Sequence, residues 1–197
     1  MLAASQARAI FAPSRIYIRP FMRTPLLGAA LVALLAACSS DKSADSADQI
    51  MSTGFEDLEG WVPPSPSLTK EKAHSGKYAI KVDPTIEYSM TYINVMGKVM
   101  PSKPNKLHLT AWVMGASKEA DAVLTVQMLN PKDGTSLMNE QMHVKEKIKK
   151  PGEWEKVEME FAVPEKATFT DEMRVYLWRV GSGEPVYMDD IELSIVR

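Results

Sequence analysis

One carboxylate in the last predicted strand lies where a charge is costly. Residues 186–195 alternate as a strand does, with every second side chain on one face. Asp189 then falls on the apolar face, between Tyr187 and Ile191. A buried carboxylate needs a cation or several hydrogen-bond donors. We therefore expect Asp189 to bind a metal ion, to accept backbone or tyrosine hydrogen bonds, or to pair with a lysine. The opposite face, expected to be solvated, carries Met188, Asp190, Glu192 and Ser194.

A second candidate site consists of aromatic and hydrogen-bonding side chains. Three predicted strands, 107–114, 122–129 and 173–180, alternate apolar residues with others. If they share one sheet, its non-core face carries His108, Thr110, Trp112, Gln127, Arg174, Tyr176 and Trp178. Aromatic rings are flat apolar platforms, and amide or guanidinium groups orient hydroxyls, so the mixture suits a sugar. The alternative is the ordinary polar outer face of a sandwich, with Arg174 paired to Glu172 or Asp171.

Catalytic patterns have little support. The histidines, His74, His108 and His143, are scattered and show no metal-binding spacing. Gly181-Ser182-Gly183 precedes a predicted strand, whereas a nucleophile elbow is followed by a helix. We therefore expect a protein that binds rather than an enzyme.

The first 37 residues have the composition of a secretory signal. Four arginines and no acid precede a short apolar run, which ends in Leu35-Ala36-Ala37-Cys38. These four residues resemble the lipobox of bacterial lipoproteins, which implies cleavage before Cys38 and its lipidation. Cys38 is the single cysteine, so a disulfide within the chain is excluded. The basic leader is long, and we hypothesise that translation starts at Met22.

The remainder divides into a tether and one domain. Residues 38–51 are mostly small and polar and predict a flexible tether behind the lipid, whereas residues 52–197 predict the folded domain. Four of the 23 basic residues precede Cys38 and all 25 acids follow it, so the mature chain has a net charge of −6. This balance argues against nucleic-acid binding. The predicted location is the bacterial envelope, most simply the outer membrane, facing the periplasm or the cell surface.

Strand signals dominate the domain. Alternating segments are separated by turn formers such as Asn130-Pro131-Lys132-Asp133-Gly134 and Pro151-Gly152. This spacing predicts an all-β fold, a two-sheet antiparallel β-sandwich. Residues 86–95 are predicted to form one long strand. The residues expected in the core include Trp61, Tyr78, Trp154 and Phe161, and the methionines are interpreted as adaptable packing rather than copper ligands.

The order of landmarks resembles xylanase-associated carbohydrate-binding modules of the 4/9 and 22 kind. The opening match consists of Gly54-Phe55-Glu56, Trp61 and residues 73–82, and the later predicted strands follow in order through 186–193. The resemblance covers about residues 52–196. It implies a galactose-binding-like jelly roll, a sugar site on the concave sheet face and a structural calcium ion near the chain termini. Glu56 and Asp189 match the side-chain ligands of that calcium, and Lys77 matches a backbone ligand.

We therefore predict a lipid-anchored, non-catalytic carbohydrate-binding protein with a poly- or oligosaccharide partner. The alternative is a structural or protein-interaction envelope lipoprotein with the same sandwich but no sugar site. Geometry discriminates between them. Trp112, Tyr176 and Trp178 should line one open groove if a sugar binds, and should lie under loops or on different sheets if none does.

Overall fold

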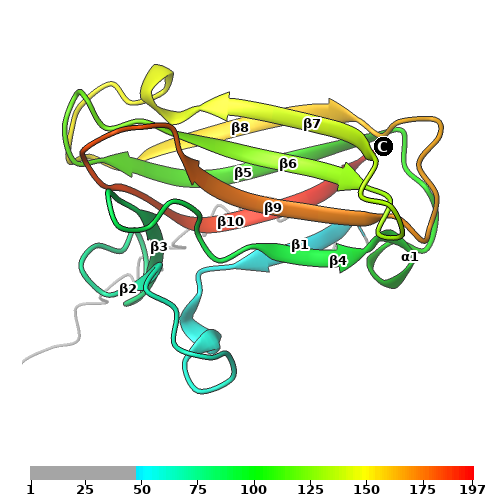
Figure 1. The fold of residues 1–197 in the computed structure, drawn as a ribbon, viewed down its shortest axis with the longest axis horizontal. Coiled ribbons are helices and arrows are strands. Elements are labelled where there is room, and N and C mark those ends of the chain that lie inside the picture. The colour runs from blue at the N-terminus through cyan, green and yellow to red at the C-terminus, as the bar shows by residue number, and fades with distance from the viewer. Residues whose placement is uncertain (1–47) are drawn as a thin grey trace, which may run out of the picture. The chain divides into compact units, whose positions relative to one another are not determined.

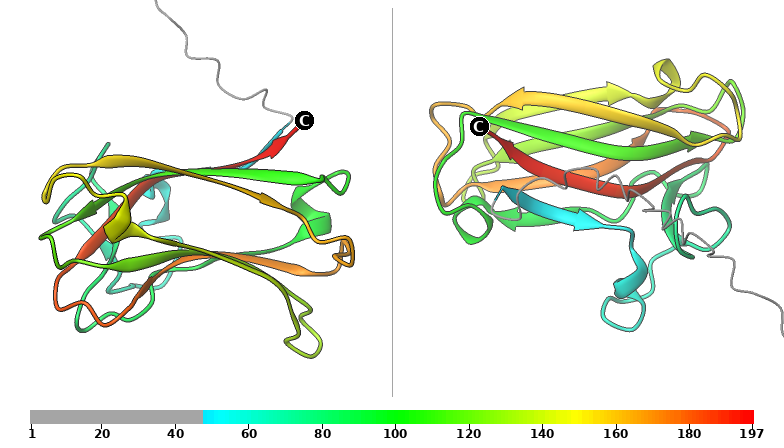
Figure 2. Two further views of the ribbon diagram at one scale, coloured as in Figure 1. Left: turned by 90° about the horizontal axis from the view of Figure 1, so that it is seen from above. Right: turned by 180° about the vertical axis from the view of Figure 1, so that it is seen from behind.

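Ten strands form two antiparallel sheets in the computed structural model, which describes residues 48–197 (Figure 1). The larger sheet consists, in spatial order, of β2 (Leu68–Thr69), β3 (Ala79–Val82), β10 (Val186–Val196), β5 (Lys106–Gly115) and β8 (Glu155–Ala162), with β1 (Gln49–Thr53) also paired to β10. The smaller sheet consists of β4 (Tyr92–Val95), β9 (Glu172–Arg179), β6 (Ala122–Leu129) and β7 (Ser136–His143). The two sheets stack as layers (Figure 2), so the predicted two-sheet sandwich is confirmed.

Helical segments are short. They are a 3-10 turn η1 (Glu56–Leu58), a single α-helical turn α1 (Met96–Val99) and a second 3-10 turn η2 (Val144–Glu146). β3 pairs with the first residues of β10, and β1 pairs with its later residues. The loop between β1 and β2, which contains η1, projects from this edge of the sandwich (Figure 1).

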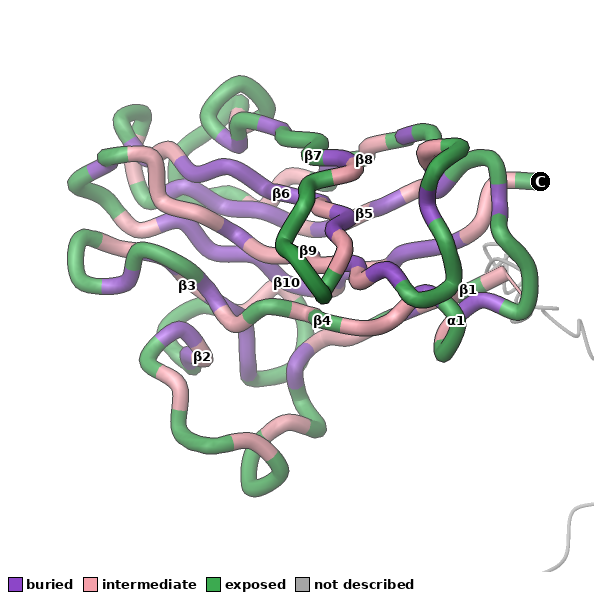
Figure 3. Tube along the Cα trace, turned by 45° about the vertical axis from the view of Figure 1, so that its right-hand side comes forward, coloured by how far each residue is buried: buried purple, intermediate pink, exposed green. Residues whose placement is uncertain are grey.

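Alternate residues of the strands build the core between the sheets. Leu107, Leu109, Ala111 and Val113 of β5 are fully buried, and Leu124 of β6 packs in the same cluster. Burying a leucine or valine side chain contributes about 1.5–3 kcal/mol. The buried segments of the tube in Figure 3 follow the strands, and the loops are mostly exposed.

A β-bulge changes which side chains of β10 face the core. Asp189 lies opposite Trp112 of β5 and Glu192 lies opposite Thr110, so three steps on β10 match two on β5. Asp190 has a left-handed φ of 43° at this bulge.

The predicted faces of β10 are therefore wrong before the bulge. Met188 belongs to the core and is 1% exposed. Tyr187 and Asp189 lie on the outer side of the sheet, whereas Ile191, Leu193 and Ile195, after the bulge, pack against the core as expected. A bulge inserts one residue, and one residue reverses the face of every side chain before it.

Other local expectations had mixed outcomes. Tyr78 and Phe161 are buried as predicted, but Trp61 is 88% exposed, so its core assignment was wrong. The methionines most deeply placed in the hydrophobic cluster are Met96, Met100, Met128, Met138, Met142, Met173 and Met188, as the packing interpretation expects. The predicted strand 86–95 contains regular pairing only in β4, while β7 was not predicted.

The start of the domain differs from the expected boundary. β1 begins at Gln49, inside the predicted tether, and pairs with Ser194. Cys38, the leader and the earlier part of the tether lie outside the described residues, so their roles stay predictions. Within residues 48–197 we find no helix with the length and apolar character needed to cross a membrane.

Candidate functional site

The predicted ligand residues divide between the two outer faces of the sandwich. His108, Thr110 and Trp112 lie on β5 in the larger sheet, whereas Gln127, Arg174, Tyr176 and Trp178 lie on β6 and β9 in the smaller sheet. The condition for a common site, that the three strands share one sheet, is therefore not met. Alternation indicates which side chains share a strand face, but it does not indicate which strands pair.

On the larger sheet, Trp112 is covered. The His74 imidazole stacks on its indole with 3.9 Å between ring centroids and 13° between planes, and Trp154 meets the imidazole edge-on at 5.8 Å. His74 Nδ1 lies 2.6 Å from Asp190 Oδ2. His108 Nε2 lies 3.7 Å from Glu158. Trp112 therefore packs against the β2–β3 connection and offers no open platform.

On the smaller sheet, three aromatic rings gather at the surface. Tyr88 stacks near Trp178, with 6.2 Å between centroids and 9° between planes, and meets Tyr176 at 6.0 Å and 60°. A β-bridge joins Tyr88 to Trp178, and Tyr88 is 52% exposed. We call the outer side of β4, β9, β6 and β7 the aromatic face.

Polar groups accompany these rings. Arg174 and Gln127 are cross-strand partners and line a hollow of about 300 Å³ with Tyr88, Thr91, Ile93 and Tyr176. Arg174 Nε donates to Glu172 Oε1 at 2.6 Å, the pairing left open as the alternative above. Among the described residues, the buried Trp178 Nε1 and Thr125 Oγ1 have no hydrogen-bond partner. The face thus combines stacking surface with donors and acceptors.

Sequence reasoning missed part of this face. Tyr88 was assigned to a strand but not to the site, although its aromatic side chain was a usable signal. On β7, Asn139, Gln141 and His143 lie opposite Gln127, Thr125 and Val123. These residues became candidates only once β7 was known to pair with β6.

A second cluster forms where Asp189 and Glu56 contact the turn of residues 74–78. Asp189 Oδ2 accepts hydrogen bonds from the backbone N–H groups of His74 (2.7 Å) and Ser75 (3.1 Å), and Asp189 Oδ1 accepts one from Asp190 (2.7 Å). Glu56 Oε1 accepts two more, from the N–H groups of Lys77 (2.7 Å) and Tyr78 (2.8 Å). The opening and closing segments of the domain therefore hold one turn between them.

Burial dominates the electrostatics of Asp189. Desolvation raises the pKa of its carboxyl above the ordinary value of 3.8, and the N–H groups of Ser75, Asp190 and His74 oppose the rise. Asp190, expected to be solvated, instead binds His74 and accepts a 2.7 Å hydrogen bond from the Ser75 hydroxyl.

The predicted calcium ligands fit a metal site only in part. Glu56 and Asp189 do contact one turn, and a carboxylate has four lone-pair sites, so both keep acceptor capacity. Within residues 48–197, no three acidic, histidine or cysteine side chains form a metal-binding group. A calcium ion here would take most of its six to eight oxygens from the backbone, Lys77 included, and from water. Calcium stays a prediction.

Solved carbohydrate-binding modules share this fold. A family 16 module is 20% identical with a TM-score of 0.50, covering 73% of this chain and 97% of its own. The xylan-binding CBM22-1 domain of Paenibacillus barcinonensis Xyn10C is 17% identical with a TM-score of 0.50, covering 79% and 99%. The C-terminal family 22 module of Clostridium thermocellum Xyn10B is 14% identical with a TM-score of 0.51, covering 78% and 96%.

Sequence comparison identifies the family. No curated protein sequence matches the chain significantly. The family model for the carbohydrate binding domain CBM_4_9 matches residues 47–182, which include every strand of the aromatic face. The resemblance derived from the order of landmarks is thereby confirmed, and the chain belongs to the carbohydrate binding domain family CBM_4_9.

Proposed function

We propose that this protein binds a carbohydrate on the aromatic face and performs no catalysis itself. The observation that carries the proposal is the cluster of Tyr88, Tyr176 and Trp178 beside Arg174 and Gln127, on one sheet face of a carbohydrate-binding domain. Pyranose rings have apolar C–H faces that stack on aromatic rings, and their hydroxyls need oriented donors and acceptors. Both needs are met within one hollow and its rim.

The proposed site is smaller and differently composed than the sequence predicted. Gln127, Arg174, Tyr176 and Trp178 are retained, and Tyr88 is added. His108, Thr110 and Trp112 lie on the other sheet, with Trp112 covered by His74, and are excluded. Two of the three aromatic residues chosen to discriminate sugar binding from a purely structural role thus share a face, and the third does not.

Lipid anchoring at Cys38 is proposed from the sequence. A lipidated Cys38 would hold the domain at an envelope membrane through residues 39–48, with β1 beginning directly after them. The domain would then present the aromatic face to polysaccharides in the periplasm or at the cell surface. Metabolic labelling with a fatty-acid analogue, lost in Cys38→Ser, tests the anchor separately from sugar binding.

A glycan array tests the binding function. We expect the wild-type protein to bind a defined glycan class and Trp178→Ala to lose that binding, while Trp112→Phe, changed on the covered face, keeps it. Circular dichroism of each variant controls for folding. Failure of the folded wild type to bind plant, microbial or host glycans would favour an envelope lipoprotein that uses the sandwich for protein contacts.

A further inference from the structure

Hollows continue beyond the aromatic face, past the edge strand β4. The hollow on the face shares Thr91 and Ile93 with a mainly apolar hollow of about 390 Å³ along that edge. The edge hollow in turn shares Leu58 and Val62 with a third hollow of about 920 Å³, under the β1–β2 loop. The shared lining residues show that the three hollows are neighbours, and we call this row of hollows, from the sheet face past Ile93 to the loop, the furrow.

Trp61 stands beside this furrow on the β1–β2 loop. Its backbone N–H donates to the carbonyl of Leu58 at 3.1 Å, as does that of Val62 at 3.2 Å, and its chain neighbours Gly60 and Val62 both line the hollow under the loop. At 88%, Trp61 is the most exposed large apolar side chain among residues 48–197, and Ile93, midway along the furrow, is 52% exposed. An exposed indole beside a groove is available to stack on a ligand that lies in the groove.

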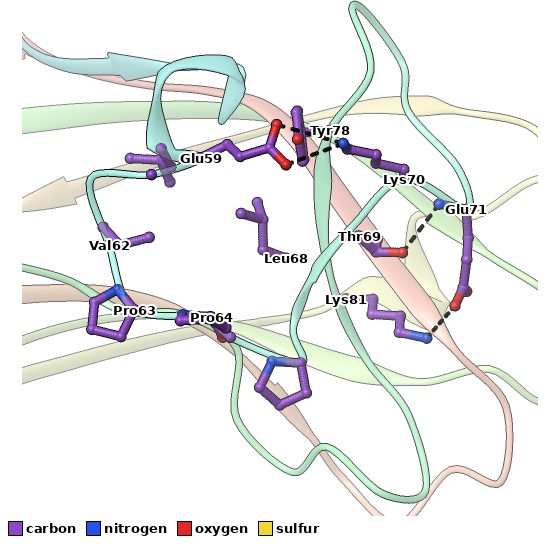
Figure 4. A pocket seen from close by; sticks show the side chains of 14 residues that line it. Glu59, Val62, Pro63, Pro64, Leu68, Thr69, Lys70, Glu71, Tyr78 and Lys81 are labelled. Atoms are coloured by element: carbon purple, nitrogen blue, oxygen red, sulfur yellow. Dashed lines mark hydrogen bonds and ion pairs between the residues drawn. The ribbon is translucent and has the colours of Figure 1, made fainter.

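The charges along the furrow are compensated. In the hollow under the loop, Lys70 pairs with Glu59 at 3.3 Å on one side and Lys81 pairs with Glu71 at 2.7 Å on the other (Figure 4). Leu68 and the prolines of the β1–β2 loop form the apolar part of the same wall (Figure 4). On the sheet face, Arg174 pairs with Glu172. Each of these cations has an acidic partner, so the furrow has no excess of positive charge that would favour an acidic ligand.

We propose that the polysaccharide bound on the aromatic face extends past Ile93 to Trp61, which stacks on its far sugar units. This inference rests on the proposed function of the aromatic face and extends it. Trp178 and Tyr176 serve every ligand, whereas Trp61 contributes only when the bound chain is long enough to reach the loop. Trp61 thereby sets the preference for long chains over short ones.

Isothermal titration of the full chain in detergent tests this division. The probes are xylo- and cello-oligosaccharides from the disaccharide to the octasaccharide, with polygalacturonate as the acidic polymer. For the wild type we expect affinity to rise with chain length in a neutral series, with no binding of polygalacturonate. Trp61→Ala should weaken the longest oligosaccharides roughly tenfold and leave the shortest that binds unchanged. Trp61→Phe should restore most of the loss.

Phe169→Ala is the matched control, because Phe169 is another exposed aromatic residue (46%) and neither it nor its neighbours in the chain line any of the three hollows. We expect it to bind as the wild type does. If Trp61→Ala keeps the wild-type dependence on length, the extension to the loop is wrong while the aromatic face stands. Tighter binding of polygalacturonate than of either neutral series would contradict the inference that the furrow does not favour an acidic ligand. A wild type that binds no probe overturns the inference, and a negative glycan array would then remove the proposed function as well.

Discussion

The two outer faces of the sandwich carry similar, partly exposed aromatic residues, but they differ in what packs over those residues. On the larger sheet, the indole of Trp112 lies 3.9 Å beneath the imidazole of His74. On the smaller sheet, Tyr88 and Trp178 stack side by side and Tyr88 is half exposed. Outward-facing aromatic residues on a strand therefore do not define a binding site. The segments that pack over them determine whether their rings can contact a ligand.

The β2–β3 connection is the segment that covers Trp112, and three acidic residues hold it in place. Asp189 accepts hydrogen bonds from two of its backbone N–H groups, and Glu56 accepts those of Lys77 and Tyr78. Earlier in the connection, Glu71 binds Lys81 of β3 at 2.7 Å and accepts a hydrogen bond from Tyr187 of β10 at 3.0 Å. The larger sheet thus uses its polar residues to secure a loop, and the smaller sheet leaves comparable groups at the surface.

Replacing Trp178 and Trp112 by alanine, one at a time, tests the comparison of the two faces and has the largest expected effect. Trp178→Ala should reduce glycan affinity by about 2 kcal/mol, roughly thirtyfold, since a central tryptophan commonly dominates a binding site. Trp112→Ala should keep glycan affinity and lower the free energy of unfolding by about 3 kcal/mol, because a packed indole is removed. Titration and urea unfolding of both variants measure the two effects. Similar loss of glycan affinity in both would contradict the distinction between the faces.

Releasing the cover should make the larger sheet resemble the smaller one. Asp189→Ala removes the acceptor of three backbone N–H groups and should lower the free energy of unfolding by about 2 kcal/mol. Amide hydrogen exchange should accelerate at residues 74–75. Glu160→Ala is the control, because Glu160 forms only an exposed ion pair with Lys106. Unchanged exchange at the turn would show that Glu56, Glu71 and the stacking on Trp112 hold the cover without Asp189.

Calcium should strengthen the same turn if the predicted site forms. At ten times its dissociation constant, a ligand specific for the native state adds about 1.4 kcal/mol. We therefore expect calcium to raise Tm and EDTA to reverse the rise. Glu56→Gln and Asp189→Asn should both lose the response, and magnesium should not replace calcium. A Tm unaffected by calcium would leave the N–H groups as the sole compensation of these carboxylates.

Acidification should weaken the contacts of Glu71, and we expect this to change the free energy of unfolding least of all the tests. The hydrogen bond from Lys81 is the first cause that lowers the pKa of Glu71 below its ordinary value of 4.5, followed by that from Tyr187. A lowered pKa stabilises the fold above pH 4.5, and this contribution is lost as the pH falls through the folded-state value. Because Glu71 is half exposed, we expect less than about 1 kcal/mol.

The contribution of Asp189 to stability changes with pH in the opposite direction to that of Glu71. Because its pKa is raised, its contribution to stability is present below its ordinary value of 3.8 and is lost as the pH rises through the folded-state value. The Glu71 effect is therefore measured as the difference between wild type and Glu71→Gln in urea unfolding from pH 3 to pH 6. A difference that is constant over this range would contradict it.

Much of the fold could be predicted because strand signals are local. Residues 122–129 were predicted as a strand and form β6 with the same bounds, and the predicted strands 107–114 and 173–180 lie within one or two residues of β5 and β9. Residues 136–143 were missed because they alternate weakly, with exposed Asn139, Glu140 and Gln141 in succession. Trp61 was misplaced because a large apolar residue in a loop predicts burial only on average.

The sequence by itself determined the all-β class, the family and most strand positions, and the lipidation of Cys38 stays a prediction. The tertiary structure alone decided which strands pair, the reversal of faces at the bulge beside Asp190, and the covering of Trp112. The physical reason is the separation along the chain of the residues that interact. Alternation reports on neighbouring residues, whereas strand pairing and loop coverage depend on contacts between segments about a hundred residues apart, such as His74 and Asp189.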